Sequence, residues 1–329
     1  MPKEEIMVHK MKVAAVQMRA ELGNVKSNLS TAEALVREAF RKGAKWVILP
    51  EFFPSAVAFA PNMLTAWRPL EGEPFQLMQK LAREYEGVIG GSFIAKSGDD
   101  CLNSFLLVFP SGEYFRHDKD IPTMWENCYY IGGQDDGVLK TPTGPVGVAV
   151  CWEFIRSQTA RRMQNRVDLI VGGSCWWDVR LPADAKYEAD RARLHNFLKI
   201  APSRLARMAG APVIHASHAG DFEGLIPGGE SRKYRSRYLG ETQIVDGTGQ
   251  VLSHMTYDDG EGIAFADLEL GRVPPTEPIP ETFWIEPLPS NASKAWETLA
   301  SFGQNYYSTV LKPTLVKEPS IRNSKPAAY

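Results

Sequence analysis

Short apolar segments alternate with amphipathic segments of helical period, and this alternation restricts the fold of the chain more than any other feature. Residues 11–18 (MKVAAVQM) form an apolar run rich in valine and alanine, which predicts a buried strand. In residues 24–44 the apolar side chains recur mostly at steps of three and four, which predicts a helix that stops near Gly43. Residues 46–49 (WVIL) predict the next strand.

The same alternation continues to about residue 271. Further helices are predicted over residues 74–85, 157–165 and 187–208, the last interrupted by Pro202. Further strands are predicted over residues 88–94, 103–109, 113–116, 146–150, 168–171, 212–217, 242–246, 251–255 and 263–268. Some strands are joined by hairpins and others are separated by helices. This pattern favours an α/β fold in which mixed sheets are covered by helices.

Prolines become frequent in the last part of the chain. These prolines are Pro274, Pro275, Pro278, Pro280, Pro287 and Pro289. They indicate an extended arm, which contains one predicted helix near residues 293–302. We therefore divide the chain into an N-terminal extension (residues 1–10), one main domain (residues 11–272) and a C-terminal arm (residues 273–329).

Charge and cysteine content exclude several classes of partner. The 37 Lys and Arg residues nearly balance the 39 Asp and Glu residues, so no global field attracts nucleic acid or an anionic membrane. No apolar run reaches the ~18 residues of a membrane-spanning helix, and residues 1–10 lack the apolar stretch of a signal peptide. The four cysteines are too scattered for a disulfide framework or a zinc site. We expect a cytoplasmic protein that acts on a small molecule.

Three of the predicted strands end at a reactive polar residue. Glu51 follows the strand in VILPEFF, Lys119 follows the strand in YFRHDK, and Cys151 follows the strand in GVAVCWE. Strand ends are where α/β sheets expose residues to ligands. A turn after Cys151 would also place backbone N–H groups near the thiol, where they can stabilise a thiolate or an oxyanion. Taken singly, each residue has a plain structural alternative, since cysteines are often buried packing residues.

Together these segments resemble the nitrilase superfamily of carbon–nitrogen hydrolases, whose members carry a Glu–Lys–Cys triad at three strand ends in this chain order. The resemblance runs from MKVAAVQM through VILPE, the HDK segment and GVAVCWE to DLIVGGS and EGIAFADLEL. It implies a four-layer αββα sandwich, with Glu51 as general base, Lys119 as oxyanion stabiliser and Cys151 as nucleophile. It also implies a homodimer or a higher homo-oligomer, with the C-terminal arm at an interface.

Elementary chemistry explains why these three residue types act together. An amide or nitrile carbon is a weak electrophile, so a thiol with an ordinary pKa of about 8.5 needs a base beside it. Glu51 would take the thiol proton. The Lys119 ammonium would meet the negative charge that develops on the substrate, with the backbone N–H of Trp152 as a second donor. This chemistry requires no metal and no organic cofactor.

Four further residues are candidates for the site. Glu126 lies seven residues after Lys119, where many members of the superfamily carry a second glutamate, and it would orient Lys119 and the substrate; the alternative is a solvated loop carboxylate. Trp176 follows the strand in DLIVGG, whose end borders the pocket in the family's fold. Arg156 is a candidate for binding an anionic substrate. However, CWEFIR departs from the CxDxR pattern of carbamoylases in spacing and has Glu153 in place of the aspartate.

A basic loop over residues 231–238 (SRKYRSRY) could bind a substrate carboxylate, although such a run of charges is usually a solvated face. The resulting hypothesis is a cysteine-dependent hydrolase of non-peptide C–N bonds in a small molecule, most consistent with an amidase or N-carbamoyl amidohydrolase. The alternative within the family is a true nitrilase. An alternative of another class is a non-catalytic interaction protein on the same fold, whose mark would be the loss of a triad residue.

Overall fold

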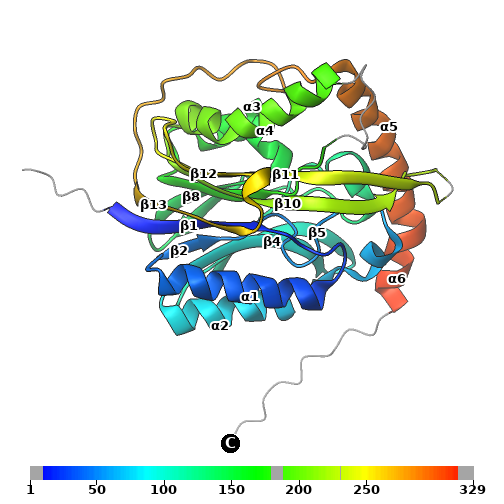
Figure 1. Ribbon diagram of the computed structural model, residues 1–329, viewed down its shortest axis with the longest axis horizontal. Coiled ribbons are helices and arrows are strands. Elements are labelled where there is room, and N and C mark those ends of the chain that lie inside the picture. Colours follow the sequence, from blue (N-terminus) through cyan, green and yellow to red (C-terminus); the bar gives the residue numbers. More distant parts are fainter. Residues whose placement is uncertain (1–9, 179–187, 230, 318–329) are drawn as a thin grey trace, which may run out of the picture.

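A computed structural model of the chain describes residues 10–178, 188–229 and 231–317. Its strands form a continuous sheet that is arranged as two facing layers, with α1 and α2 outside one layer and α3 and α4 outside the other (Figure 1). The predicted four-layer αββα sandwich is therefore confirmed. The predicted N-terminal extension lies outside the described residues except for Lys10, which begins β1.

The first layer contains the strands and helices of the N-terminal half. Its strand order is β6-β5-β4-β2-β1, with β1, β2 and β4 parallel and the β4–β5–β6 pairs antiparallel. The strands are β1 (Lys10–Met18), β2 (Trp46–Ile48), β4 (Val88–Ser97), β5 (Asp100–Val108) and β6 (Tyr114–Asp118). The short strand β3 (Arg68–Pro69) pairs with β4, and the covering helices are α1 (Val25–Arg41) and α2 (Glu73–Tyr85).

The second layer begins where β10 pairs with β1 at Gln17↔Ser217 and Met18↔His218. From β10 the order continues β9-β8-β7 on one side and β11-β12 on the other. The strands are β7 (Val138–Thr141), β8 (Gly144–Val150), β9 (Leu169–Ser174), β10 (Val213–Leu225), β11 (Lys233–Val245) and β12 (Val251–Thr256). The helices α3 (Ser157–Met163) and α4 (Glu188–Ala209) cover this layer, and β13 (Gly262–Glu269) pairs antiparallel with β1.

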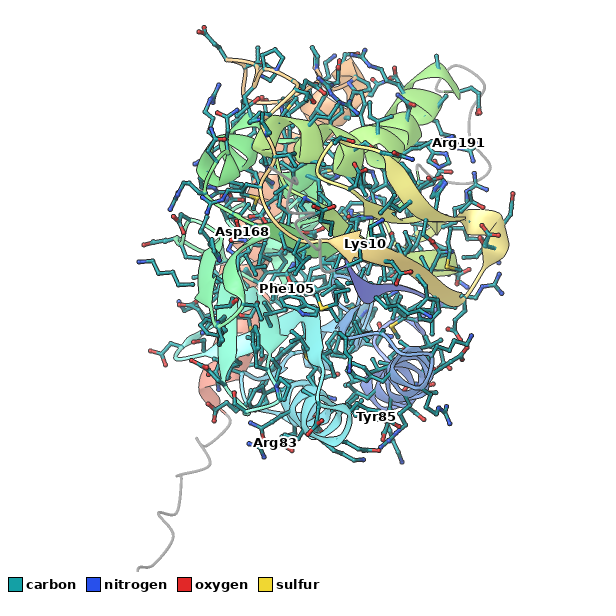
Figure 2. All side chains as sticks on the ribbon, turned by 90° about the vertical axis from the view of Figure 1, so that its left-hand side faces the viewer. Lys10, Arg83, Tyr85, Phe105, Asp168 and Arg191 are labelled. Atoms are coloured by element: carbon teal, nitrogen blue, oxygen red, sulfur yellow. The ribbon has the colours of Figure 1, made fainter. Side chains whose placement is uncertain are left out.

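Strand β1 separates two hydrophobic cores because successive side chains point to opposite faces. Val13 and Ala15 belong to the larger core between the two layers, whereas Ala14 and Val16 belong to the core beneath α1 and α2. This double burial explains why the strand is an unbroken apolar run. Figure 2 shows Phe105 of β5 deep in the interior, where it is 1 % exposed.

Two expectations about elements are wrong. Helix α4 is not interrupted at Pro202 but continues through it, because buried side chains on both sides of the proline hold the helix against its neighbours. The predicted basic loop over residues 231–238 is largely the start of β11, where Arg235 lies opposite Glu223 of β10. The segment alternates charged residues on the solvated face with Tyr234, Ser236 and Tyr238 on the inner face, where both tyrosines pack on Phe222 of β10.

The C-terminal arm returns to the layers and packs on the segment that contains Glu126. This arm contains α5 (Ser290–Tyr306), a π-helical turn η6 (Tyr307–Leu311) and α6 (Lys312–Lys317), and α5 lies against the 3₁₀ helix η2 (Met124–Cys128). Gly303 permits this close approach, since a Cβ there would lie 2.6 Å from Asn127 Cβ. None of the described helices is both long and apolar enough to cross a membrane.

Candidate active site

The ends of β2, β6 and β8 bring Glu51, Lys119 and Cys151 into one buried cluster. All three residues are fully buried. The Lys119 Nζ donates to Glu51 Oε1 at 2.9 Å and to Glu126 Oε2 at 2.7 Å. The Cys151 Sγ and one carboxylate oxygen each of Glu51 and Glu126 lie within 4.8 Å of one another. The structure thus brings together the four residues for which catalytic roles are predicted.

Cys151 lies in a strained turn between a strand and a helix. It follows β8 directly and begins the 3₁₀ helix η3 (Cys151–Ile155), with a backbone φ of 56°. This left-handed conformation is unfavourable for a residue with a Cβ, and such strain is concentrated at functional sites. Trp152 lies in the first turn of η3, where backbone N–H groups have no acceptor within the helix. The turn therefore places a thiol beside an N–H group that can serve a ligand.

Glu51 is held by three donors, of which sequence reasoning identified only Lys119. Asn103 Nδ2 of β5 donates to Glu51 Oε1 at 2.9 Å, and the backbone N–H of Cys175 donates to Oε2 at 2.9 Å. Gly173 makes room for this strand end, because a Cβ there would lie 2.8 Å from the Glu51 nitrogen. Burial raises the pKa of Glu51 to about 7, against the opposing effect of the Lys119 charge. Glu51 can therefore take up or release a proton near neutral pH.

Glu126 is oriented by its own turn and by a tyrosine that the sequence analysis did not identify. Its Oε2 accepts hydrogen bonds from Lys119, from the Thr123 backbone N–H at 3.0 Å and from the Tyr130 hydroxyl. Its other oxygen, Oε1, is buried and has no hydrogen-bond partner. A buried carboxylate oxygen without a donor is costly, so a ligand that supplies an N–H or O–H group there would be stabilised.

The charges of the cluster favour a resting thiol beside a protonated lysine. Burial lowers the pKa of Lys119, but the carboxylates of Glu126 and Glu51 outweigh it and hold that pKa well above its usual value. Burial and then the neighbouring Glu51 carboxylate raise the pKa of the Cys151 thiol well above its usual value. Cys151 thus needs to transfer its proton as it attacks, and Glu51 is the adjacent acceptor.

Comparison with known proteins matches residues 12–277 to the model of the carbon–nitrogen hydrolase family. The chain belongs to the carbon–nitrogen hydrolase family. The resemblance to the nitrilase superfamily is thereby confirmed. The chain is 34 % identical over 166 residues to an N-carbamoylputrescine amidase from Oryza sativa subsp. japonica. This alignment covers 47 % of the chain and 54 % of the relative. It is 30 % identical over 158 residues to a nitrilase from Pyrococcus abyssi, covering 46 % of this chain and 60 % of the relative.

The chain therefore aligns with little more than half the length of these curated relatives. A solved structure of a carbon–nitrogen hydrolase from Helicobacter pylori G27 superposes with a TM-score of 0.66 at 21 % identity, covering 80 % of this chain and 90 % of that one. At this identity the similarity establishes the fold, which the αββα layers already display.

A metal ion would compete with Lys119 in this member of the family. Among the described residues, Glu51, Glu126 and Cys151 are the group whose donor atoms lie close enough together to bind an ion. Since the Lys119 ammonium already bonds an oxygen of each carboxylate, a cation would have to displace it. The cluster is better suited to a fixed ammonium than to a metal.

The predicted substrate-binding residues divide into two groups. Trp176 lines a large cavity beside the cluster, together with Trp152, whose backbone N–H is the predicted oxyanion donor, whereas Glu153 and Arg156 are absent from the described lining of that cavity. Arg156 is fully buried, pairs with Asp120 and donates to the Ile121 carbonyl at 3.0 Å. Its guanidinium is therefore occupied, and a role in binding an anionic substrate is not supported.

Three of the four cations of the segment 231–238 are also in ion pairs, and Arg232 donates to the Gly229 carbonyl. Lys233 and Arg235 both contact Glu223, and Arg237 contacts Asp178. None of these three is among the described residues that line the cavity. The geometry therefore favours a solvated face over the binding of a substrate carboxylate.

Glu153 belongs instead to a buried ion pair that joins the strand end of Lys119 to the turn of Cys151. The two ring nitrogens of His117 face carboxylates, with Nε2 3.0 Å from Glu153 Oε2 and Nδ1 beside Asp135. Glu153 also accepts from the backbone N–H groups of Val150 at 2.8 Å and Asp120 at 2.9 Å. The segment from His117 to Asp120 contains Lys119, and the segment from Val150 to Glu153 contains Cys151. The ion pair and these hydrogen bonds therefore fix the position of Lys119 relative to Cys151.

The protonation of His117 leads to a prediction about stability. Burial lowers the pKa of His117, but Glu153 and Asp135 outweigh it and raise that pKa to about 10, against about 6.5 in the unfolded chain. The stabilisation is therefore complete below pH ~6.5 and is lost as the pH rises toward 10. The difference in free energy of unfolding between wild type and His117→Gln should be largest near pH 6 and shrink steadily up to pH 10.

Denaturant unfolding at several pH values measures this difference, with His218→Gln as the matched control. Burial lowers the pKa of His218 to about 4, so the stability that its neutral form contributes is lost only as the pH falls below about 6.5. The effect of His218→Gln should therefore be constant from pH 7 to 10. A constant effect of His117→Gln over the same range would show that His117 is neutral in the folded protein.

Proposed function

We propose that this protein is a cysteine-dependent hydrolase of a non-peptide C–N bond, with a small-molecule carboxamide or N-carbamoyl compound as substrate. The observation that carries the proposal is the buried contact of Lys119 with Glu51 and Glu126 beside the Cys151 thiol. A base, a cation and a nucleophile in one enclosed site are the groups that acyl transfer to a thiol requires.

In the first half of the proposed reaction, Cys151 Sγ attacks the carbonyl carbon while Glu51 takes the thiol proton. The negative charge that develops on the carbonyl oxygen is met by the Lys119 ammonium and by the backbone N–H of Trp152. Glu51 then donates its proton to the departing nitrogen, and ammonia or an amine leaves a thioester on Cys151. A pKa of about 7 for Glu51 suits both of these proton transfers.

In the second half, water replaces the amine. Glu51 removes a proton from the water as it attacks the thioester carbon, and the same two donors hold the oxyanion. Collapse of this adduct returns the proton to the Cys151 sulfur and releases a carboxylic acid from a carboxamide, or a carbamic acid, which loses CO₂, from an N-carbamoyl compound. Every step uses side chains of the buried cluster, and no metal is needed.

The unpartnered oxygen of Glu126 favours an amide or carbamoyl substrate over a nitrile. The NH₂ group of a carboxamide or carbamoyl compound can donate to Glu126 Oε1, whereas a nitrile nitrogen carries no hydrogen. Relatives of both kinds exist, since the Oryza protein is named for N-carbamoylputrescine and the Pyrococcus protein is a nitrilase. In this chain the unpartnered Glu126 Oε1 favours the amide or carbamoyl substrate over the nitrile.

Ammonia release from a carboxamide, a nitrile and an N-carbamoyl amine that share one carbon skeleton tests the proposal, with Cys151→Ala as the blank. We expect kcat/KM for the amide or carbamoyl compound to exceed that for the nitrile by at least about tenfold, the cost of leaving a buried charged acceptor unpaired. Faster turnover of the nitrile would favour the nitrilase alternative. No Cys151-dependent release from any compound of a broad panel would favour a non-catalytic interaction protein.

A further inference from the structure

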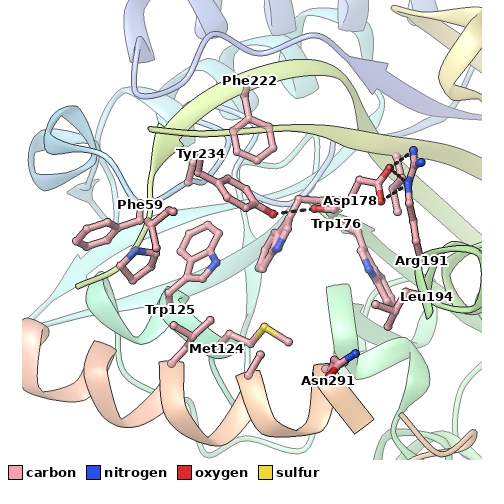
Figure 3. A pocket seen from close by; sticks show the side chains of 18 of the residues that line it. Phe59, Met124, Trp125, Trp176, Asp178, Arg191, Leu194, Phe222, Tyr234 and Asn291 are labelled. Atoms are coloured by element: carbon pink, nitrogen blue, oxygen red, sulfur yellow. Dashed lines mark hydrogen bonds and ion pairs between the residues drawn. The ribbon is translucent and has the colours of Figure 1, made fainter. Parts of the chain in front are cut away.

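A cavity of about 700 Å³ lies beside the buried cluster. Its walls come from η2, from the turns that follow β8 and β9, and from β10, α4 and α5 (Figure 3). This volume is within the range of sites that enclose a whole small molecule. The buried cluster itself needs room only for one carbonyl group and its nitrogen, so the cavity is available to the rest of the substrate.

The inner wall of the cavity consists of residues that are sequence neighbours of the reacting groups. Trp152 follows Cys151, Trp125 precedes Glu126, and Trp176 follows Cys175, whose N–H bonds Glu51. A substrate whose carbonyl carbon lies at Cys151 would therefore extend its carbon chain along the surface that these three indole rings form.

This wall is aromatic and rigid. The rings of Trp152 and Trp176 lie 5.5 Å apart, and those of Trp125 and Trp177 lie 4.5 Å apart, both pairs tilted by less than 40°. Trp296 of α5 also stacks on Trp152, with the ring centroids 5.2 Å apart and an interplanar angle of 11°. Aromatic rings prefer offset or tilted contacts at these distances, so a flat ring of the substrate would find favourable partners.

The charged groups at the outer end of the cavity are already paired. Arg191 is the arginine among the described lining residues, and it contacts the Asp178 carboxylate at 2.7 Å (Figure 3). Asp190 accepts from Asn291 at 2.8 Å, and His195 contacts Glu241 at 3.0 Å. An anionic tail would have to displace Asp178 from Arg191, and a cationic tail would find Asp190 partly exposed and bonded to the Asn291 amide, so an uncharged occupant is favoured.

We propose that the natural substrate carries a bulky, uncharged, apolar acyl group with an aromatic ring, which this indole-lined cavity encloses. The inference rests on the proposed function, because it concerns the carbon chain of the compound whose C–N bond is broken. It goes beyond that function in excluding short amides and amides with an ionised tail.

Four amides that differ only in their tail test the inference: 3-phenylpropanamide, propanamide, succinamate and 4-aminobutanamide. We expect kcat/KM for 3-phenylpropanamide to exceed that for each of the other three by at least about 30-fold, because burial of a phenyl ring is the main difference among them. Equal or greater Cys151-dependent turnover of propanamide or of either charged amide would overturn the inference and leave the proposed function intact. No turnover of all four, with turnover of other amides, would also overturn it.

A substitution in the cavity separates binding of the tail from the chemistry. Leu299 of α5 lines the cavity and is half-buried, so Leu299→Lys adds a charge there that can still reach solvent. The variant should lower the ratio of kcat/KM for 3-phenylpropanamide to that for succinamate by at least about tenfold. The matched control Leu252→Lys, on exposed β12, should leave the ratio unchanged. An unchanged ratio in Leu299→Lys would place the acyl group outside this cavity.

Discussion

Replacement of Cys151 by alanine is expected to lower kcat/KM for an amide substrate by at least about 10⁴-fold, because no other group can form the covalent thioester. The fully buried lysine and two glutamates would remain and could still polarise the carbonyl group and activate water, but the covalent route through Cys151 would be lost. Single-turnover measurements with a chromogenic anilide detect such a loss. In wild type, pre-steady-state measurements with excess substrate should also reveal a burst of amine equal to the enzyme concentration if hydrolysis of the thioester is slower than its formation.

The matched control for this prediction is Cys101→Ala. Cys101 is as fully buried as Cys151, but it lies within β5 and its pKa is raised to about 12 by burial. Its loss should reduce stability through a small cavity and leave kcat/KM within about threefold of wild type. Activity of Cys151→Ala within about 10²-fold of wild type would contradict the assignment of the nucleophile.

Replacement of Lys119 by arginine or alanine is expected to lower kcat/KM by at least about 10²-fold, equivalent to roughly 2.7 kcal/mol of transition-state stabilisation. Arginine keeps the positive charge, but its wide planar fork cannot occupy the place of an ammonium that bonds Glu51 at 2.9 Å and Glu126 at 2.7 Å. We therefore expect the arginine variant to be nearly as impaired as the alanine variant.

The two variants of Lys119 are expected to differ in stability, so their rates can be compared only after correction for the fraction of folded protein. Lys119→Ala leaves two buried carboxylates without their shared cation, so it should also lower the melting temperature. Rates must therefore be expressed per folded molecule, determined by circular dichroism at the assay temperature. A loss of about tenfold or less in folded Lys119→Ala would indicate that the oxyanion is stabilised by other groups.

The layers of the fold were predictable because local patterns and tertiary burial agree. Val13 and Val16 lie in different cores, and a strand buried on both faces has to be apolar throughout, as residues 11–18 are. The start of β11 was not predictable in this way. There the cations Lys233, Arg235 and Arg237 alternate with inward side chains, which is the pattern of a strand with one solvated face, and the run of charges alone suggested a loop.

The same distinction applies to the candidate site. Glu51, Lys119 and Cys151 each end an apolar run, so the sequence indicates them directly. Asn103 and Tyr130 have no such signal: one is a polar residue within β5 and the other follows η2, and they meet the carboxylates only after the layers assemble. The prediction that Arg156 binds an anionic substrate is not supported, because Arg156 pairs with Asp120. The position of a cation along the chain does not reveal such a pairing.

The helix α5 begins at Ser290, beyond residues 12–277 that match the family, yet it supplies Trp296 behind Trp152 and Leu299 in the cavity wall. One wall of the cavity, formed by α5, is thus encoded after the segment that carries the reacting groups and the indole rings beside them. Changes after residue 277 can alter which compound is accepted while leaving every strand end in place. Divergence in this terminal helix therefore offers a short evolutionary route to a changed choice of substrate, provided that its contact with η2 is kept.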